Sequence, residues 1–297
     1  MTRSSALRVL RIATCLALLA VVHAPSTTAS DARVELRVLH FVDTSRTIRL
    51  PDGRRVPRPV TTFVRFPASG RRPWPLIVFG HGFAATPGMY AKLLDAWARA
   101  GYVVAAPLFP LGNAHAPGGP NESDIVNQPR DMSFVTTRLL EASASRTGVF
   151  SGLIDPARIA VAGQSDGGVT AFAAAYDPDY RDRRIDAVVI LSAAPVLGAW
   201  FRFPHPGPPL IVTQGTADTI NPASHTYAFY AAAPRPKFML TLRGAEHVPP
   251  YTTEEPQLGI VAAVTTAFLD HYLKADSLAR IARAAHDPGV ATLVQSP

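Results

Sequence analysis

The chain has 297 residues, of which 47% are apolar and only 17% are charged, and its formal net charge at pH 7 is +7. This composition excludes a disordered chain and a protein that coats nucleic acid, while the length is enough for one large domain with a hydrophobic core. The 28 prolines and 20 glycines indicate many shaped loops, which are typical of a functional site built on loops.

The first 30 residues have the pattern of an export signal. Three arginines precede an apolar stretch over residues 12–22, and small residues follow up to Ser30. The apolar stretch is shorter than the about 20 residues that span a bilayer, so cleavage and secretion are expected, with an N-terminal membrane anchor as the alternative. The sequence therefore predicts a signal peptide over residues 1–30 and a single secreted domain over residues 31–297.

The only cysteine, Cys15, lies inside the apolar stretch of this signal. A lipid-attachment cysteine would follow the apolar core, so lipidation is not expected. The mature chain then has no thiol, which excludes both a disulfide and a cysteine nucleophile. Losing three of the 29 basic residues leaves a net charge of +4 against the 22 acidic ones. This modest excess predicts neither a nucleic-acid partner nor stable membrane insertion, and it leaves the oligomeric state open.

Strands are predicted by short apolar runs that Gly or Pro bounds. Two polar-rich runs come first, and they predict an antiparallel edge hairpin over residues 34–42 and 60–66 with a turn-like connection over residues 47–59. Six buried parallel strands are then predicted, over residues 76–79, 102–106, 159–162, 187–191, 210–213 and 238–242. The tail beyond Leu278 is polar and is expected to pack loosely.

Helical patterns fall between these strands. They cover residues 89–99, 134–144 (continuing a helix begun near Arg130), 169–176 and 258–272. Alternating strands and helices predict an α/β fold, with a mostly parallel sheet of about eight strands and helices on both faces.

The most informative segment is Gly163-Gln164-Ser165-Asp166-Gly167, which follows a predicted strand and opens a predicted helix. This is the context that a G-x-S-x-G nucleophile motif requires, because the serine sits on a tight turn that leaves no room for side chains at the flanking glycines. The pentapeptide alone is a weak signal, and a serine in an ordinary strand-to-helix turn is the alternative. Its position predicts Ser165 as a nucleophile.

An acid and a base follow two later strands in the order that this fold uses. Asp218 comes after the strand at residues 210–213, and His247 comes after the strand at residues 238–242. Both lie at strand C-terminal ends, where open α/β sheets place their sites. The sequence therefore predicts a Ser165–His247–Asp218 triad, which needs no metal and no cofactor.

Other acids and histidines fit these roles less well. Asp186 precedes its strand, and the side chain of Glu246 should diverge from that of its neighbour His247. His81 follows the strand at residues 76–79 within Gly80-His81-Gly82-Phe83, where a role in the turn is expected. The backbone amides of Phe83 and Asp166 are predicted to form an oxyanion hole. The Phe83 ring lines an acyl pocket or lies in the core.

These motifs, together with Gln214-Gly-Thr-Ala-Asp218 and Gly244-Ala-Glu-His247, resemble the platelet-activating-factor acetylhydrolase-like and dienelactone-hydrolase-like α/β hydrolases, near the actinobacterial lipase and cutinase group. The segment 118–131 also resembles the loop before the nucleophile strand in the first group. The resemblance covers about residues 34–275. It implies the α/β-hydrolase fold, the same triad and oxyanion amides, and carboxylic ester substrates.

Two features of the chain depart from these families. Dienelactone hydrolases proper use a cysteine nucleophile, and polyester hydrolases usually carry a C-terminal disulfide and an earlier counterpart of Trp200. The acidic side chain of Asp166 also replaces a bulkier apolar residue, and we expect it to point away from the oxyanion, toward an arginine or a backbone N–H. The sequence predicts a secreted serine ester hydrolase acting on small-molecule or lipid esters. A lipase, a polyester hydrolase and a non-catalytic binding protein are the alternatives.

Overall fold

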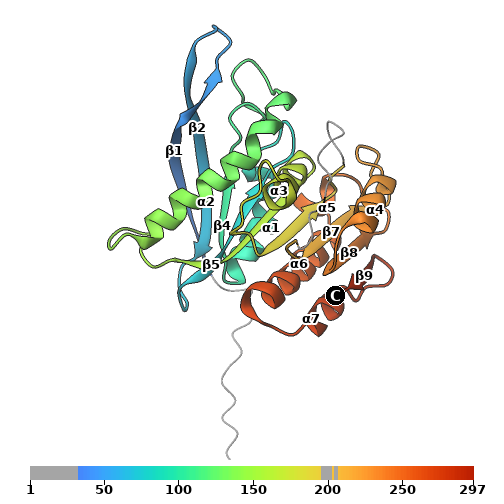
Figure 1. The fold of residues 1–297 in the computed structure, drawn as a ribbon. Coiled ribbons are helices and arrows are strands. Elements are labelled where there is room, and N and C mark those ends of the chain that lie inside the picture. Colours follow the sequence, from blue (N-terminus) through green and yellow to red (C-terminus); the bar gives the residue numbers. More distant parts are fainter. Residues whose placement is uncertain (1–32, 195–202, 204–206) are drawn as a thin grey trace, which may run out of the picture.

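The computed structural model describes residues 33–194, 203 and 207–297. The predicted signal with Cys15 lies outside these residues, as do Trp200 and His205. Within them, nine strands form one sheet in the order β1-β2-β4-β3-β5-β6-β7-β8-β9 (Figure 1). The strands are β1 (Val34–Arg49), β2 (Arg55–Pro67), β3 (Trp74–Gly80), β4 (Val103–Pro107), β5 (Ile154–Gln164), β6 (Ala187–Leu191), β7 (Leu210–Gly215), β8 (Lys237–Leu242) and β9 (Ala291–Ser296).

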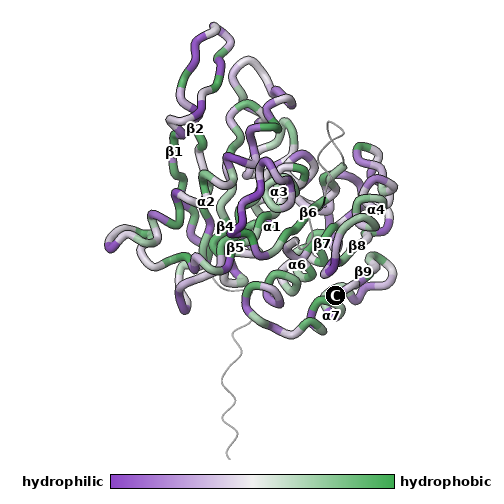
Figure 2. Tube along the Cα trace, viewed as in Figure 1, coloured by the Kyte–Doolittle hydropathy of each residue, from purple (hydrophilic) through white to green (hydrophobic). Residues whose placement is uncertain are grey.

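The central part of the sheet is parallel. Strands β4, β3, β5, β6, β7 and β8 run in one direction, and β1, β2 and β9 add antiparallel pairs at the two edges. Every residue of β3, β4, β6 and β7 is buried, as expected for parallel strands covered on both faces. Figure 2 shows hydrophobic residues running along these central strands. The predicted fold class and its six parallel strands are confirmed.

Helices cover both faces of this sheet. They are α1 (Ala91–Arg99), α2 (Gln128–Ala144), α3 (Asp166–Tyr176), α4 (Ala223–Ala232), α5 (Pro249–Thr252), α6 (Gln257–Lys274) and α7 (Ala279–Ala284), with the 3-10 turns η2 (Pro87–Tyr90) and η3 (Glu122–Asn127). Four of them were predicted, whereas α4, α5 and α7 were not. In the described ranges, no helix is both long and apolar enough to span a bilayer.

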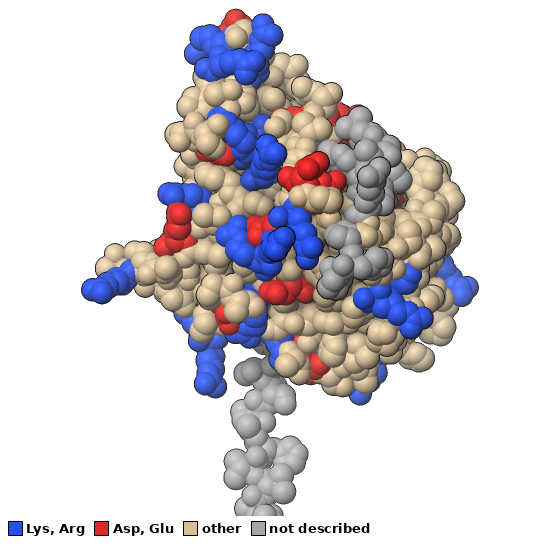
Figure 3. Space-filling view, in the orientation of Figure 1, with Lys and Arg blue, Asp and Glu red and all other residues tan. Residues whose placement is uncertain are grey.

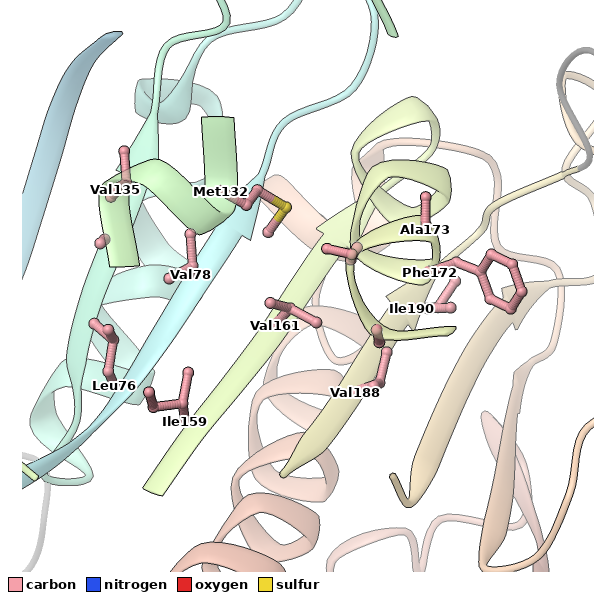
Figure 4. Packing of buried hydrophobic residues seen from close by; sticks show 14 of the residues in the cluster. Leu76, Val78, Met132, Val135, Ile159, Val161, Phe172, Ala173, Val188 and Ile190 are labelled. Carbon is pink, nitrogen blue, oxygen red and sulfur yellow. The ribbon is translucent and has the colours of Figure 1, made fainter. Parts of the chain in front are cut away.

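Alternation along each strand divides the core into two layers. In β3, Leu76 and Val78 face one layer while Ile77 and Phe79 face the other. Figure 4 shows the first layer, where side chains of α2 and α3 meet those of the central strands, among them Met132, Val135, Phe172, Val161, Val188 and Ile190. The second layer packs against α1, α6 and α7. This two-sided burial holds the carboxyl ends of the parallel strands in place.

The predicted edge hairpin is present, but its strands are longer than expected. Pairing runs from Val34 opposite Pro67 to Arg49 opposite Arg55, so the turn occupies only residues 50–54 instead of 47–59. Pro57 and Pro59 lie in β2, inside the segment that was expected to be turn-like. They fit a strand because β2 pairs with β4 only over residues 62–65, and the free edge elsewhere needs no ladder N–H. Basic side chains gather at the tip of the hairpin, around this turn (Figure 3).

The prediction for the tail is wrong. Beyond Leu278 the chain forms α7, whose Ile281 is fully buried, and then β9, which pairs antiparallel with β8 from Lys237 to Leu242. The strand escaped detection because it is short and half-exposed, and Thr292, Gln295 and Ser296 leave little hydrophobic signal. The tail thus supplies the ninth strand and closes the edge of the sheet beside β8.

Candidate active site

The nucleophile motif forms a tight elbow between β5 and α3. Ser165 has φ +54° and ψ −124°, a strained conformation for a residue other than glycine. A Cβ at Gly163 would lie 2.0 Å from the Gly167 carbonyl oxygen, and a Cβ at Gly167 would lie 2.0 Å from the Gly80 carbonyl oxygen. Only glycine fits at either position. The elbow therefore holds the Ser165 side chain, which is partly exposed, at the carboxyl edge of the sheet.

Three side chains from separate loops meet at this elbow. The Nε2 atom of His247 lies 3.0 Å from the Oγ of Ser165, and its Nδ1 lies 2.8 Å from the Oδ2 of Asp218. Because Asp218 accepts the Nδ1–H, Nε2 is free to accept the proton of the Ser165 hydroxyl. The structure thus brings together the three residues that the sequence predicted, in the geometry that serine nucleophiles require.

Asp218 is held as a carboxylate by several donors. Its Oδ1 accepts hydrogen bonds from the backbone N–H groups of Ile220 (3.0 Å) and Asn221 (2.8 Å), and its Oδ2 accepts one from Gln214 Nε2 at 3.2 Å. Burial raises the pKa of Asp218, but the hydrogen bonds from His247 and Asn221 outweigh it and hold the pKa below its usual value. An ionised Asp218 can fix the orientation of the His247 ring.

The other candidate acids and histidines lie elsewhere. The Asp186 carboxylate accepts a hydrogen bond from the backbone N–H of Ile159, at the start of the buried part of β5 and away from the elbow. Glu246 is exposed and does not contact His247 Nδ1, which is bound to Asp218. His81 is buried, and burial lowers its pKa to about 4. Its Nδ1–H donates to the Gly82 carbonyl and its Nε2 accepts from the Phe109 N–H, so His81 shapes the turn.

The two amides predicted for the oxyanion hole are free to donate. Asp166 is the first residue of α3, where the helix itself supplies no acceptor for its N–H. The N–H of Phe83 donates to no backbone carbonyl in the described parts of the chain. The Phe83 side chain is 42% exposed, so it does not lie in the core, and its ring remains available to contact an acyl group.

The Asp166 side chain differs from expectation. It is only 6% exposed, and in the described chain no arginine and no backbone N–H binds its carboxylate. Burial, with a smaller contribution from nearby Glu122 and a lowering effect of His247, raises the pKa of Asp166 to about 6. The expectation that an arginine or a backbone N–H binds this carboxylate is therefore wrong for the described residues. A carboxylate without a hydrogen bond from them lies directly beside Ser165.

Two buried residues join the loop of residues 80–83 to His247, and the sequence did not indicate them. Tyr90 accepts a hydrogen bond from the Gly82 N–H (3.3 Å) and donates one to Gln164 Oε1 (2.7 Å). Gln164 Nε2 in turn donates a hydrogen bond to the His247 carbonyl oxygen at 3.0 Å, and it lies 3.3 Å from Nε2 of the His247 ring. Burial raises the pKa of Tyr90 to about 12, so its hydroxyl stays protonated. We infer that Gln164 is a positioning residue for His247.

Replacing Gln164 with alanine should lower kcat for ester hydrolysis by about ten- to a hundredfold with little change in KM. The reason is that His247 loses the hydrogen bond from the Gln164 amide to its carbonyl. Steady-state kinetics and the pH profile of kcat/KM measure this. Tyr90→Phe should act in the same direction but less, and adding it to Gln164→Ala should cost little more, since both act through one chain of bonds. Additive losses, or an unchanged kcat with lowered stability, would show a merely structural role.

A buried ion network supports the loop that precedes α2. The Arg58 guanidinium binds Asp131 through Nε (2.7 Å) and Asp124 through Nη1 (2.9 Å), and Arg46 adds an ion pair with Asp131 at 2.7 Å. Asp124 lies in η3 and Asp131 in α2, while Arg58 lies on β2. The network therefore anchors η3, which carries Glu122 beside the active site, to the hairpin.

The fold and the arrangement of serine, histidine and aspartate at the sheet edge define the chain as an α/β hydrolase of the serine ester hydrolase type. The family model described as Chlorophyllase matches residues 40–215, more than half of the chain. The chain belongs to the chlorophyllase family and is a carboxylic ester hydrolase. No curated protein matches its sequence.

This family assignment confirms the predicted kinship with dienelactone-hydrolase-like serine esterases at the level of the superfamily, and it names a particular family. The match includes Phe83 and Ser165 but ends at Gly215, before Asp218 and His247. The positions of the acid and the base therefore come from the structure and not from the family model.

Proposed function

We propose that the chain hydrolyses carboxylic esters through an acyl-enzyme on Ser165. In the first step the Ser165 oxygen attacks the ester carbonyl while His247 Nε2 takes its proton, and that proton then leaves with the alcohol. In the second step water, deprotonated by His247, attacks the acyl-enzyme and releases the acid and Ser165. The contact of 3.0 Å between His247 Nε2 and Ser165 Oγ carries this proposal.

The amides of Phe83 and Asp166 are proposed to bind the oxygen of the tetrahedral intermediate. Among the described residues no backbone carbonyl accepts from either N–H group, and the Asp166 N–H lies at the positive end of the α3 dipole. Asp218 keeps the His247 ring in the tautomer that accepts the serine proton and stabilises the imidazolium that forms. These residues complete the proposed site without a cofactor.

The site of action is proposed from the sequence of residues 1–30. A basic start, a short apolar core and small residues support export through a cleaved signal, and this segment lies outside the described residues. We propose that the enzyme acts in the cell envelope or outside the cell as one domain over residues 31–297.

A substrate panel identifies the particular ester. The family's name points to chlorophyll, while the exposed Phe83 ring beside the proposed oxyanion loop suits an apolar acyl or alcohol group. A lipase and a polyester hydrolase are alternative functions of the same proposed triad, although the chain, with one cysteine, cannot form the disulfide that is usual in polyester hydrolases. Activity toward p-nitrophenyl esters of increasing chain length, chlorophyll, triglyceride emulsions and a polyester film separates these substrates.

A fluorophosphonate probe tests the proposal against a non-catalytic binding protein of the same fold. Such a probe reacts with a serine whose hydroxyl a neighbouring base activates. We expect stoichiometric labelling of Ser165, located by peptide mass spectrometry, and no labelling after denaturation. An unlabelled native protein would refute the proposed mechanism.

A further inference from the structure

Asp166 differs from the other deeply buried aspartates of the described chain. Asp124 and Asp131 bind Arg58, Asp218 binds His247, and Asp270 binds Tyr102 and Lys274. Asp43 likewise binds Ser45 and Arg46. Asp166 is just as buried, yet no hydrogen bond and no ion pair reaches its carboxylate. Because a buried charge without a partner is costly, the described residues leave Asp166 without the counter-charge that its burial calls for.

The titratable groups that face Asp166 come from three other elements. Glu122 of η3 is an exposed acid that adds negative potential, His247 in the loop after β8 adds positive potential when protonated, and Tyr90 at the end of η2 stays neutral. With His247 neutral, as the base must be before attack, the local field is negative. Asp166 is 6% exposed, and its carboxylate oxygens are not completely sealed from solvent.

The position of Asp166 limits where such a ligand lies. The backbone N–H of Asp166 is a proposed oxyanion donor, and the preceding residue is the proposed nucleophile Ser165. A cation bound to the Asp166 carboxylate would therefore lie close to the ester that is cleaved. We propose that Asp166, supported by Glu122, forms a cation-binding subsite beside Ser165, and that the preferred substrates are small esters with an ammonium group near the scissile bond. This inference rests on the proposed function and names the substrate class of the same site.

Binding such a substrate completes the site electrostatically. The ammonium charge offsets the uncompensated carboxylate in a partly desolvated place, where attraction between opposite charges is stronger than in water. The same carboxylate in an empty or uncharged complex opposes the developing oxyanion, so an ester without a positive charge reacts against a repulsion that a cationic ester relieves. Selectivity should therefore appear in kcat/KM.

Matched ester pairs test this subsite in the full-length enzyme. One pair is butyrylcholine and its analogue with tert-butyl in place of trimethylammonium; the other carries the same exchange on the acyl chain of an ethyl butyrate ester. At pH 8 we expect kcat/KM to favour the cationic member of at least one pair by about tenfold. Asp166→Asn should remove most of this preference, and Glu122→Gln should remove part of it.

A matched control and a pH series complete the experiment. Asp179→Asn makes the same charge change at an exposed site beyond the C-terminal end of α3, and it should leave the preference intact. The preference should shrink as the pH falls from 8 to 5, since the Asp166 carboxylate, whose pKa is raised to about 6, takes up a proton. Any effect of pH that acts on both esters of a pair alike cancels in the ratio.

Two outcomes would overturn the inference while leaving the proposed function standing. They are a ratio near one for both pairs in the wild-type enzyme, and a preference that survives Asp166→Asn, with hydrolysis of the uncharged esters still requiring Ser165. If hydrolysis does not require Ser165, the proposed function and the subsite fall together.

Discussion

Replacing Ser165 with alanine should lower kcat for p-nitrophenyl butyrate by about four to six orders of magnitude and leave the fold intact. The reason is that the hydroxyl 3.0 Å from His247 Nε2 is the atom proposed to form the acyl-enzyme. Among the described side chains, only the Gln164 amide also lies within hydrogen-bond distance of His247 Nε2, and an amide is no nucleophile. Residual turnover would come from the oxyanion donors and from binding alone. Steady-state kinetics on purified protein measure the loss.

The stability of this variant should be nearly unchanged. Alanine meets the same backbone strain at φ +54° as serine does, and the substitution removes one partly exposed oxygen. Urea unfolding checks that the loss is chemical and not structural. Ser145→Ala, at an exposed position after α2, serves as a control for the serine-to-alanine change. Activity within about tenfold of the wild type would exclude Ser165 as the nucleophile.

The sequence predicted the parts of the fold whose hydrophobic pattern is strong. Buried parallel strands read as unbroken apolar runs, so β3, β6 and β7 were located to within a residue or two. Elements of weak pattern were missed or misjudged: β9 is half-exposed, α4 has no clear apolar face, and prolines hid the outer half of β2. Tertiary pairing with β8 and β1 decides these segments, and a single sequence does not show such pairing.

The candidate site divides in the same way. The order of Ser165, Asp218 and His247 along the chain predicted their meeting, because parallel strands end at one edge of the sheet. The roles of Tyr90 and Gln164 could not be predicted, since a tyrosine and a glutamine 74 residues apart carry no motif until their 2.7 Å contact is seen. The environment of Asp166 was also hidden, because only three-dimensional packing shows that none of the described arginines binds its carboxylate.

Arg58 connects stability to the site, and its removal should be the most destabilising change among the charged residues. Replacing it with alanine leaves Asp124 and Asp131 buried without their main counter-ion, and such a loss costs about 3–5 kcal/mol of unfolding free energy. Of these two acids Arg46 binds only Asp131, so it cannot replace the Arg58 guanidinium for both of them. Urea unfolding at pH 7, followed by circular dichroism, measures the difference.

Arg58→Lys is a milder variant, which keeps a positive charge beside Asp124 and Asp131 and should fold even if Arg58→Ala does not. An ammonium cannot bind two carboxylates through paired contacts as the guanidinium does, so this variant should lose part of the same stability. Arg55→Ala, on the same strand but exposed at the hairpin tip, is the matched control and should change stability by less than about 0.5 kcal/mol. Equal effects of Arg58→Ala and Arg55→Ala would show that the buried network does not hold the hairpin to η3. If the Arg58 network holds η3 in place, weakening it should also displace Glu122, which lies in η3. Arg58→Lys should then reduce the preference for cationic esters more than Arg55→Ala does.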